Sequence, residues 1–214
     1  MLIYIIRHGQ TEFNKQGIIL GHTNQSLNDE GIKQAKIVAK NIKYLQYAPI
    51  FSSDLQRAKE TAEIIAKQTK STITYLENLR EKHVGKLEGV KWNEKFDCMT
   101  YSELEQVVEE AGGESIDGFH SRVIDCFNEI VQDNMAKHDK IIIVSHGGVI
   151  KTIINKILNI TEPNNRVLRQ DNCSINIIES KKRADQPLFY MIHCINSCFH
   201  LLNDETDCST ISSM

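Results

Sequence analysis

Two histidines follow apolar, β-branched runs in this sequence, and each is followed by glycine. His8 comes after the run 2–6, with Arg7 between them, and His146 comes after the run 141–144. An imidazole can act as a nucleophile or as a general acid or base near neutral pH. A guanidinium group binds phosphate oxygens in pairs. Two histidines with an adjacent arginine therefore indicate chemistry on a phosphate, with positive charge supplied by the protein.

Other catalytic motifs are missing from the sequence. It contains no G-x-S-x-G nucleophile elbow, no Walker A loop and no G-x-G-x-x-G fingerprint. Cys194 and Cys198 lie four residues apart, but zinc would need two more ligands at suitable spacing. We therefore expect no metal and no cofactor.

Apolar runs and helical periods alternate along the first part of the chain. We expect strands at 2–6, 49–51 and 73–76, and helices at 28–45 and from residues 52–54 to 68. Residues 52–54 should cap the second helix, and residues 10–27 should form a loop. The order β-α-β-α-β indicates a parallel sheet. Because ligands bind beyond the carboxyl ends of parallel strands, His8 and His146 should both reach that edge.

The second part of the chain continues the pattern after a less regular stretch. We expect helices at 101–111, 117–136 and 149–158, and strands at 141–144, 175–178 and 188–195. The predicted fold is a three-layer α/β/α sandwich, with a mostly parallel central sheet flanked by helices. Residues 1–202 should form one domain with a small cap insertion at about 82–116, and residues 203–214 a flexible tail.

The composition excludes several classes of protein. The chain has 214 residues and a formal net charge of −3, so it has no basic footprint for nucleic acid. No apolar run approaches the ~18–20 residues that cross a bilayer. The six cysteines follow no secretory leader, which favours free thiols in a reducing, cytoplasmic compartment. The sequence leaves open whether the protein is a monomer or a homodimer.

Seven segments follow one another in a characteristic order. They are R-H-G-Q-T-E-F-N at 7–14, Gly21 to Gly31 with Leu27, S-D-L-Q-R-A-K-E-T-A at 53–62, L-R-E at 79–81 with L-E-G at 87–89, G-G-E-S at 112–115 before Arg122, V-S-H-G-G at 144–148, and Asn196 with His200-Leu201. Over about residues 1–201 this order resembles the histidine phosphatase superfamily, in its phosphoglycerate mutase-like branch. Gln10, Phe13, Leu20 and Asn24 depart from the family's common pattern.

The resemblance implies a role for each matching residue. His8 would be the nucleophile that takes the phosphoryl group. Glu81 would be the general acid that protonates the leaving group, and then the base for the attacking water. The groups that would hold the phosphate oxygens are Arg7, Asn14, Arg57, His146 and Gly147. Two arginines and a second histidine would supply the positive charge without a metal.

Some assignments stay open on the sequence alone. Glu88 or Glu114 could serve as the acid in place of Glu81, although spacing favours Glu81. Arg122 could be partly structural, and Trp92 could pack the insertion or line the substrate pocket. The remaining histidines are most simply surface or packing residues: His22, His83, His120, His138 and His193.

The length of the chain bears on the choice between two activities. A mutase must exclude water from its phosphoenzyme. In the family that this chain resembles, cofactor-dependent mutases do so with a longer insertion between the acid Glu and the second His and with a long C-terminal tail. Only 64 residues separate Glu81 from His146 (146 − 81 − 1). We therefore expect a metal-independent phosphatase for a small phosphorylated metabolite, with a phosphoglycerate mutase as the alternative. A catalytically inactive, protein-binding relative is disfavoured, because a scaffold would have no use for the full set of Arg7, His8, Arg57, Glu81 and His146.

Overall fold

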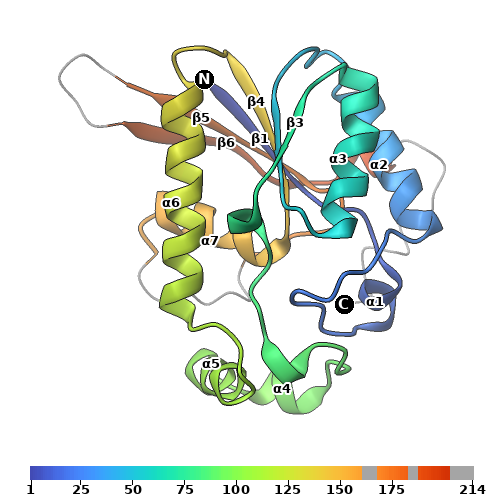
Figure 1. Cartoon of the computed structure of the whole chain (residues 1–214), viewed down its shortest axis with the longest axis vertical. Helices are drawn as coiled ribbons and strands as arrows, with labels where there is room; N and C mark the ends of the chain where they lie inside the picture. Colours follow the sequence, from blue (N-terminus) through green and yellow to red (C-terminus); the bar gives the residue numbers. More distant parts are fainter. Residues whose placement is uncertain (161–167, 183–187, 203–214) are drawn as a thin grey trace.

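A six-stranded sheet in the order β3-β2-β4-β1-β5-β6 runs through the molecule (Figure 1). The computed structural model describes residues 1–160, 168–182 and 188–202. The strands are β1 (Leu2–Arg7), β2 (Ile50–Ser52), β3 (Ile73–Tyr75), β4 (Lys140–Ser145), β5 (Ile175–Lys181) and β6 (Phe189–Ser197). The pairs β2–β3, β2–β4 and β1–β4 are parallel, whereas β5 is antiparallel to β1 and β6. The predicted mostly parallel sheet is confirmed.

Helices cover both faces of this sheet. The α-helices are α1 (Glu12–Gln16), α2 (Asp29–Asn41), α3 (Gln56–Thr69), α4 (Glu94–Cys98), α5 (Tyr101–Glu110), α6 (Ile116–Asn134), α7 (Gly147–Ile157) and α8 (Phe199–Leu202), and the 3₁₀ helices are η1 (Glu77–Leu79) and η2 (Gly85–Leu87). Side chains of α2 and α3 pack on one face, and side chains of α6 and α7 pack on the other. The predicted three-layer α/β/α sandwich is therefore confirmed.

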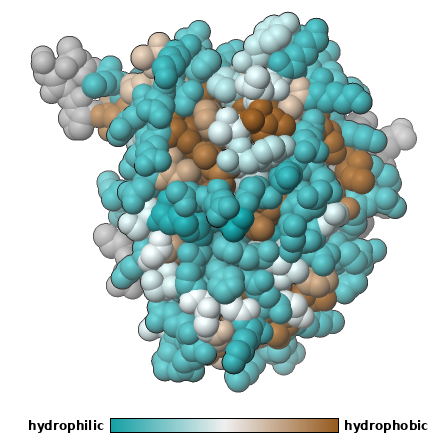
Figure 2. Space-filling model, viewed as in Figure 1, coloured by the Kyte–Doolittle hydropathy of each residue, from teal (hydrophilic) through white to brown (hydrophobic). Residues whose placement is uncertain are grey.

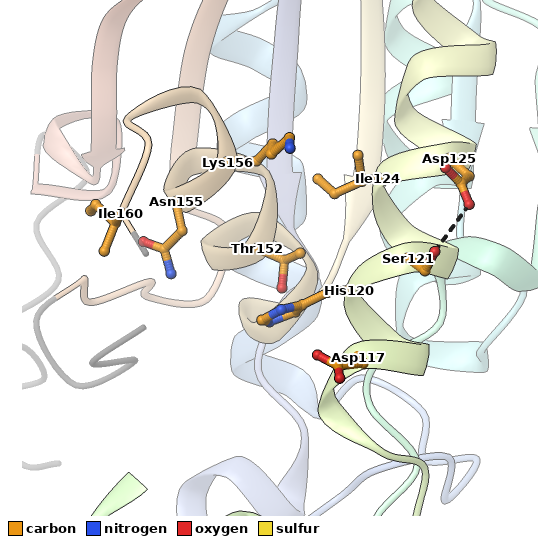
Figure 3. A pocket seen from close by; sticks show the side chains of 9 residues that line it. All are labelled: Asp117, His120, Ser121, Ile124, Asp125, Thr152, Asn155, Lys156 and Ile160. Atoms are coloured by element: carbon orange, nitrogen blue, oxygen red, sulfur yellow. Dashed lines mark hydrogen bonds between the residues drawn. The ribbon is translucent and has the colours of Figure 1, made fainter. Parts of the chain in front are cut away.

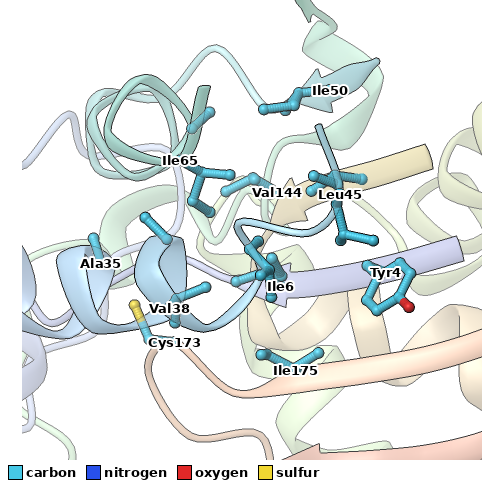
Figure 4. Close-up of a cluster of buried hydrophobic side chains, with 14 of the residues drawn as sticks. Tyr4, Ile6, Ala35, Val38, Leu45, Ile50, Ile65, Val144, Cys173 and Ile175 are labelled. Carbon is cyan, nitrogen blue, oxygen red and sulfur yellow. The ribbon is translucent and has the colours of Figure 1, made fainter. Parts of the chain in front are cut away.

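Strand β1 shows why the central strands are continuous apolar runs. Tyr4 and Ile6 point into the cluster formed with α2 and α3, part of which is drawn in Figure 4. Ile3 and Ile5 point to the opposite face, into the cluster formed with α6 and α7. A strand that is buried on both faces cannot alternate apolar and polar residues. These two layers set the position of Arg7 at the carboxyl end of the strand.

Two local predictions were wrong. The segment 10–27 is not all loop, because Thr11 caps the short helix α1 through a capping box with Asn14. The residue that precedes α3 as its N-cap is Leu55, which makes no side-chain capping bond, so residues 52–54 do not cap this helix. The hydroxyl of Ser53 instead lies beside His146.

The segment 82–116 contains η2, α4 and α5. Figure 1 shows α4 and α5 beyond the end of the sheet that lies opposite the N-terminus. Trp92 packs on Phe96 with ring centroids 5.2 Å apart, and its indole nitrogen donates to Asp97. Trp92 therefore packs the insertion. The predicted tail, 203–214, lies outside the described residues.

Hydrophilic residues cover most of the face drawn in Figure 2, and hydrophobic residues appear between them in small groups. Within the ranges that the structure describes, none of the helices has both the length and the apolar character that a membrane span requires.

Candidate active site

His8 lies at the end of β1 with its ring orientation set by two hydrogen bonds. Its Nδ1 is 2.7 Å from the carbonyl oxygen of Gly9, and a carbonyl can only accept, so Nδ1 carries the proton. Its Nε2 then has a lone pair, which accepts from Arg57 Nε at 3.3 Å. The ring is buried, with 2% of its surface exposed. The ring is therefore neutral, with a lone pair on Nε2 that could attack an electrophile.

His146 lies next to His8, as the two parallel strands predict. Strand β4 pairs in register with β1, and the two imidazole centroids are 5.2 Å apart. Nε2 of His146 is 2.8 Å from the hydroxyl of Ser53. Its Nδ1 is buried and has no hydrogen-bond partner within the described chain. A buried ring nitrogen without a protein partner is a group that a bound anion can use.

Two arginines bring positive charge to the same place. Arg57 is fully buried in the first turn of α3, and its Nη groups donate to the carbonyls of Gly21 and Thr23 at 2.8 and 2.9 Å. Arg7 donates through Nη1 to the carbonyl of Gln170. Its Nε is buried and, among the residues described, lacks a partner. Both guanidinium groups are thus oriented by backbone carbonyls rather than by carboxylates.

This environment keeps the histidines neutral. Burial, reinforced by Arg57 and Arg7, holds the pKa of His8 well below its usual value. The pKa of His146 is lowered in the same way, by burial first and then by Arg57 and His8. Burial also lowers the pKa of Arg57 to about 10, against the nearby Glu81 carboxylate, which raises it. At neutral pH the site therefore combines uncharged imidazoles with charged guanidinium groups.

Of the three candidate acids, only Glu81 reaches the helix that follows His146. Its Oε2 accepts from the backbone nitrogen of Gly148 at 3.0 Å. Glu88 instead accepts from the backbone of His22 at 2.8 Å and from the hydroxyl of Thr23 at 3.0 Å.

Glu114, the third candidate acid, is paired with Arg122 through Nη2 at 2.6 Å. The contacts of Glu88 and Glu114 occupy their carboxylates elsewhere, so the geometry favours Glu81 as the acid.

The two further predicted phosphate donors also lie at this edge of the sheet. The side-chain oxygen of Asn14 accepts from Thr11 and from Asn172, at 3.2 and 3.3 Å. Its amide nitrogen is the group that can donate to a phosphate. Gly147 begins α7, and a Cβ placed there would lie 3.7 Å from Arg7 Nε. Its backbone thus lies beside Arg7 at a helix N-terminus, where anions are favoured.

Three residues near the site were missed or undervalued in the sequence. His22 is not simply a surface residue, because its Nε2 lies 2.8 Å from the carbonyl of Glu81. Arg122 also contacts the backbone around Glu81. Asn172 donates to the carbonyl of His8 at 3.1 Å. No periodic pattern marks these residues. The family-like segments at 21–31 and 112–122 were the one available signal for His22 and Arg122, and no signal marked Asn172.

A separate pocket of about 470 Å³ lies between α6 and α7 (Figure 3). Figure 3 shows His120 and Thr152 close together across this pocket, with Asn155 further along α7. None of the predicted catalytic or phosphate-binding residues lines it. Throughout the described part of the chain, no cluster of three or more His, Cys, Asp or Glu could hold a metal ion. The two histidines and two arginines at the sheet edge are therefore the best candidate for the site of reaction.

Comparison with known proteins agrees with this geometry. The profile of the histidine phosphatase superfamily (branch 1) matches residues 3–190. A metal-independent phosphoserine phosphatase of Arabidopsis thaliana is 32% identical over 184 residues, covering 82% of this chain and 75% of the relative. A broad-specificity phosphatase of Saccharomyces cerevisiae is 28% identical over 216 residues, covering 95% of this chain and 88% of the relative.

A solved structure shares the fold. The phosphoserine phosphatase of Entamoeba histolytica, in complex with 3-phosphoglyceric acid, superposes with a TM-score of 0.77 at 28% identity, covering 94% of this chain and 98% of that one. The matched profile covers well over half of the chain, and it contains both histidines and both arginines of the site. The chain therefore belongs to branch 1 of the histidine phosphatase superfamily, and it is a phosphatase-type enzyme of that family.

Proposed function

We propose that this protein is a phosphatase that hydrolyses a small phosphomonoester through a phosphohistidine on His8. The observation that carries the proposal is the pair of hydrogen bonds that orients the neutral ring of His8. Its Nδ1 is held by the Gly9 carbonyl, so that Nε2 has its lone pair beside the guanidinium group of Arg57. A neutral imidazole with one nitrogen oriented by a hydrogen bond is the form that attacks phosphorus.

The first step transfers the phosphoryl group to the enzyme. Nε2 of His8 forms a bond to phosphorus while the bond between phosphorus and the ester oxygen breaks. Glu81 gives a proton to the departing oxygen, so that an alcohol leaves. Arg7, Arg57 and His146 stabilise the charge on the three transferred oxygens.

The second step returns the enzyme to its starting state. Glu81, now a carboxylate, takes a proton from water as the water oxygen attacks phosphorus. The bond between Nε2 of His8 and phosphorus breaks, inorganic phosphate leaves, and Glu81 is again protonated. Asn14 and the backbone nitrogen of Gly147 are the additional donors for the phosphate oxygens.

A panel of phosphorylated metabolites and p-nitrophenyl phosphate, assayed for phosphate release, tests the proposal directly. We expect hydrolysis of at least one alkyl phosphate and of the aryl ester, undiminished by EDTA. His8→Ala should lower the rate by at least about 1,000-fold, because the nucleophile of the covalent step is removed. Undiminished turnover of this variant would exclude the mechanism.

A mutase is the second candidate function, because a phosphoglycerate mutase-like protein of Arabidopsis thaliana is 34% identical over 183 residues. The two activities differ in the fate of the phosphohistidine. With 3-phosphoglycerate, release of inorganic phosphate supports the phosphatase. Formation of 2-phosphoglycerate without phosphate release would show instead that the protein is a mutase.

We further propose that the enzyme works in the cytoplasm, on a small phosphorylated metabolite and as a monomer or homodimer. Residues 1–202 would form a single domain, with about 82–116 as a cap insertion. The free thiols at Cys98, Cys126, Cys173, Cys194 and Cys198 support a reducing compartment. Light scattering of the purified chain measures the oligomeric state.

A further inference from the structure

The backbone that carries Glu81 belongs to no helix or strand, and side chains from other elements bind its carbonyls. Residues 80–84 follow η1 without regular structure. Nevertheless, each of the four carbonyls from Asn78 to Glu81 accepts a side-chain hydrogen bond. The hydroxyl of Ser145, at the end of β4, donates to Leu79 at 2.8 Å. His22 binds the carbonyl of Glu81 at 2.8 Å.

Arg122 accounts for most of this contact. Its Nη1 donates to the carbonyls of Asn78 and Arg80, each at 3.0 Å, and its Nη2 lies 3.4 Å from the carbonyl of Glu81. One side chain on α6 thus reaches three of the four successive carbonyls. A guanidinium group can do this because its five N–H donors lie in one rigid plane.

Glu114 completes the arrangement from the other side of the guanidinium group. Its carboxylate binds Arg122 with both oxygens, at 2.6 and 3.3 Å. The oxygen at 2.6 Å also accepts from the backbone nitrogen of His83 at 2.8 Å. The pair is partly buried, with about a fifth of each side chain exposed. Both ends of the segment 78–83 are therefore bound to one ion pair.

We propose that Arg122 is a positioning residue for the general acid, which orients Glu81 toward the leaving group through the backbone of residues 78–81. The inference rests on the proposed function, because it takes Glu81 as the proton donor. Arg122 contacts neither His8 nor the other phosphate-binding side chains in any of its hydrogen bonds. Loss of Arg122 should therefore impair proton donation while leaving the nucleophile and the phosphate-binding groups in place.

This role predicts a dependence on the leaving group that a purely structural role does not. An alkyl alcohol cannot leave without the proton of Glu81, whereas p-nitrophenolate leaves as an anion. Both leaving groups require the same attack by His8 and the same binding of phosphate oxygens. A displaced acid therefore slows transfer from alkyl esters selectively.

The experiment measures single-turnover release of the leaving group by rapid quench, which isolates the first step from hydrolysis of the phosphohistidine. The substrates are p-nitrophenyl phosphate and the best alkyl phosphate from the metabolite panel. For Arg122→Gln we expect alcohol release to fall about 10- to 100-fold, within the range that general acids contribute, and aryl release to change less than about threefold. Arg122→Lys, which keeps the charge without the planar donors, should fall between wild type and Arg122→Gln.

Val123→Ala is the matched control. Val123 is the next residue of α6, is fully buried in the cluster on that face, and has no hydrogen bond to the segment 78–81. It should lower the melting temperature and slow both substrates by the same factor. Equal slowing of both substrates in Arg122→Gln, or no slowing of either, would overturn the positioning role.

Two further outcomes separate the inference from the function on which it rests. If Arg122→Gln does not fold, Arg122→Lys and Glu114→Gln are measured in the same way and must show the selective loss. If the wild-type protein does not release p-nitrophenol in a step that depends on His8, the proposed function fails whatever Arg122 does.

Discussion

At the scale of single residues, the site depends on groups held in one protonation state. His8 and His146 are neutral because burial and two arginines oppose their protonation. Arg57 stays charged, although burial lowers its pKa to about 10. In the proposed mechanism this arrangement suits a dianionic phosphate, because the arginines attract the dianion and at the same time disfavour protonation of the nitrogen that would attack it.

Gly148 shows how closely the carboxylate of Glu81 approaches the backbone of α7. A Cβ at this position would lie 2.2 Å from Oε1 of Glu81 and 3.3 Å from the ring of Phe119. Gly148→Ala should therefore push the carboxylate away and lower kcat for alkyl phosphates by about 10- to 100-fold. The helix itself should tolerate the change, because Gly148 lies in the first turn of α7 and alanine is a better helix former than glycine.

Steady-state kinetics and circular dichroism of the same preparation test this prediction. Gly118→Ala in α6 is the control, since the nearest contact of its Cβ is the flexible hydroxyl of Ser115 at 3.1 Å. It should keep wild-type activity. Wild-type kcat in Gly148→Ala would show that the carboxylate of Glu81 has room to move without loss.

At the scale of elements, the first turn of α2 supports the loop that follows His8. A Cβ on Gly31 would lie 2.1 Å from the carbonyl oxygen of Gln10, and a Cβ on Gly9 would lie 2.5 Å from the carbonyl oxygen of Gly31. Asn28 caps the same turn by accepting from the nitrogen of Gly31 at 2.8 Å. Two backbones that touch leave no room for a side chain on either one.

Gly31→Ala should therefore affect both stability and activity. The clash is with backbone atoms of Gln10, so the loop after His8 must shift. We expect kcat for p-nitrophenyl phosphate to fall about tenfold or more, because small displacements of reacting groups cost that much in rate. Asn28→Ala introduces no backbone clash; it removes the cap and the hydrogen bond from the Asn28 amide to the Gln10 side chain at 2.9 Å, and the lost cap should cost about 1 kcal/mol of unfolding free energy. Urea unfolding and kinetics of both variants distinguish the two effects. A normal kcat in Gly31→Ala would mean that the loop and the helix move independently.

The success of the sequence-based predictions varied with the kind of element. Strands β1 and β4 were predicted because burial on both faces requires an apolar run, and their parallel pairing placed His8 beside His146. Helix α1 was missed because five residues are too few to show a helical period. Arg122 was undervalued because three of its partners are backbone carbonyls more than 40 residues away, and carbonyls carry no sequence signal.

At the scale of the whole molecule, net charge and local charge have opposite signs. The chain carries a formal charge of −3, yet Arg7 and Arg57 meet at one edge of the sheet. Local potential, and not the total charge, decides whether a dianion binds. A ligand that binds the folded protein and not the unfolded chain also stabilises the fold, by an amount that grows with the logarithm of the ligand concentration.

Inorganic phosphate should therefore raise the melting temperature of the wild-type protein. At 100 times its dissociation constant, the added stability is about 2.7 kcal/mol. Differential scanning fluorimetry with sodium phosphate, against sodium chloride at equal ionic strength, measures the shift. Arg57→Ala should abolish most of it. A shift of the same size in Arg57→Ala would place the bound phosphate elsewhere on the protein.

The buried histidines should also make the whole molecule sensitive to acid. In the unfolded chain His8 and His146 titrate near their usual pKa of about 6.5, whereas burial keeps their pKa values in the folded protein well below that. Below pH 6.5 the unfolded state therefore binds more protons than the folded state. The unfolding free energy should be fully present above this pH and should fall as the pH drops toward the folded pKa values, by up to about 1.4 kcal/mol per pH unit for each histidine.

Urea unfolding between pH 7.5 and 5 measures this slope. The hydrogen bonds to Arg80 and His193 lower the pKa values of Asp54 and Glu179, so these folded-state carboxylates take up protons only below this range. His8→Gln removes one of the two buried imidazoles, so the slope should decrease by up to about 1.4 kcal/mol per pH unit. Val123→Ala loses stability by leaving a cavity and removes no titrating group, so its curve should lie lower with the wild-type slope. If His8→Gln keeps the wild-type slope, His8 takes up its proton at the same pH in the folded protein as in the unfolded chain, and the site does not hold this imidazole neutral below about pH 6.5.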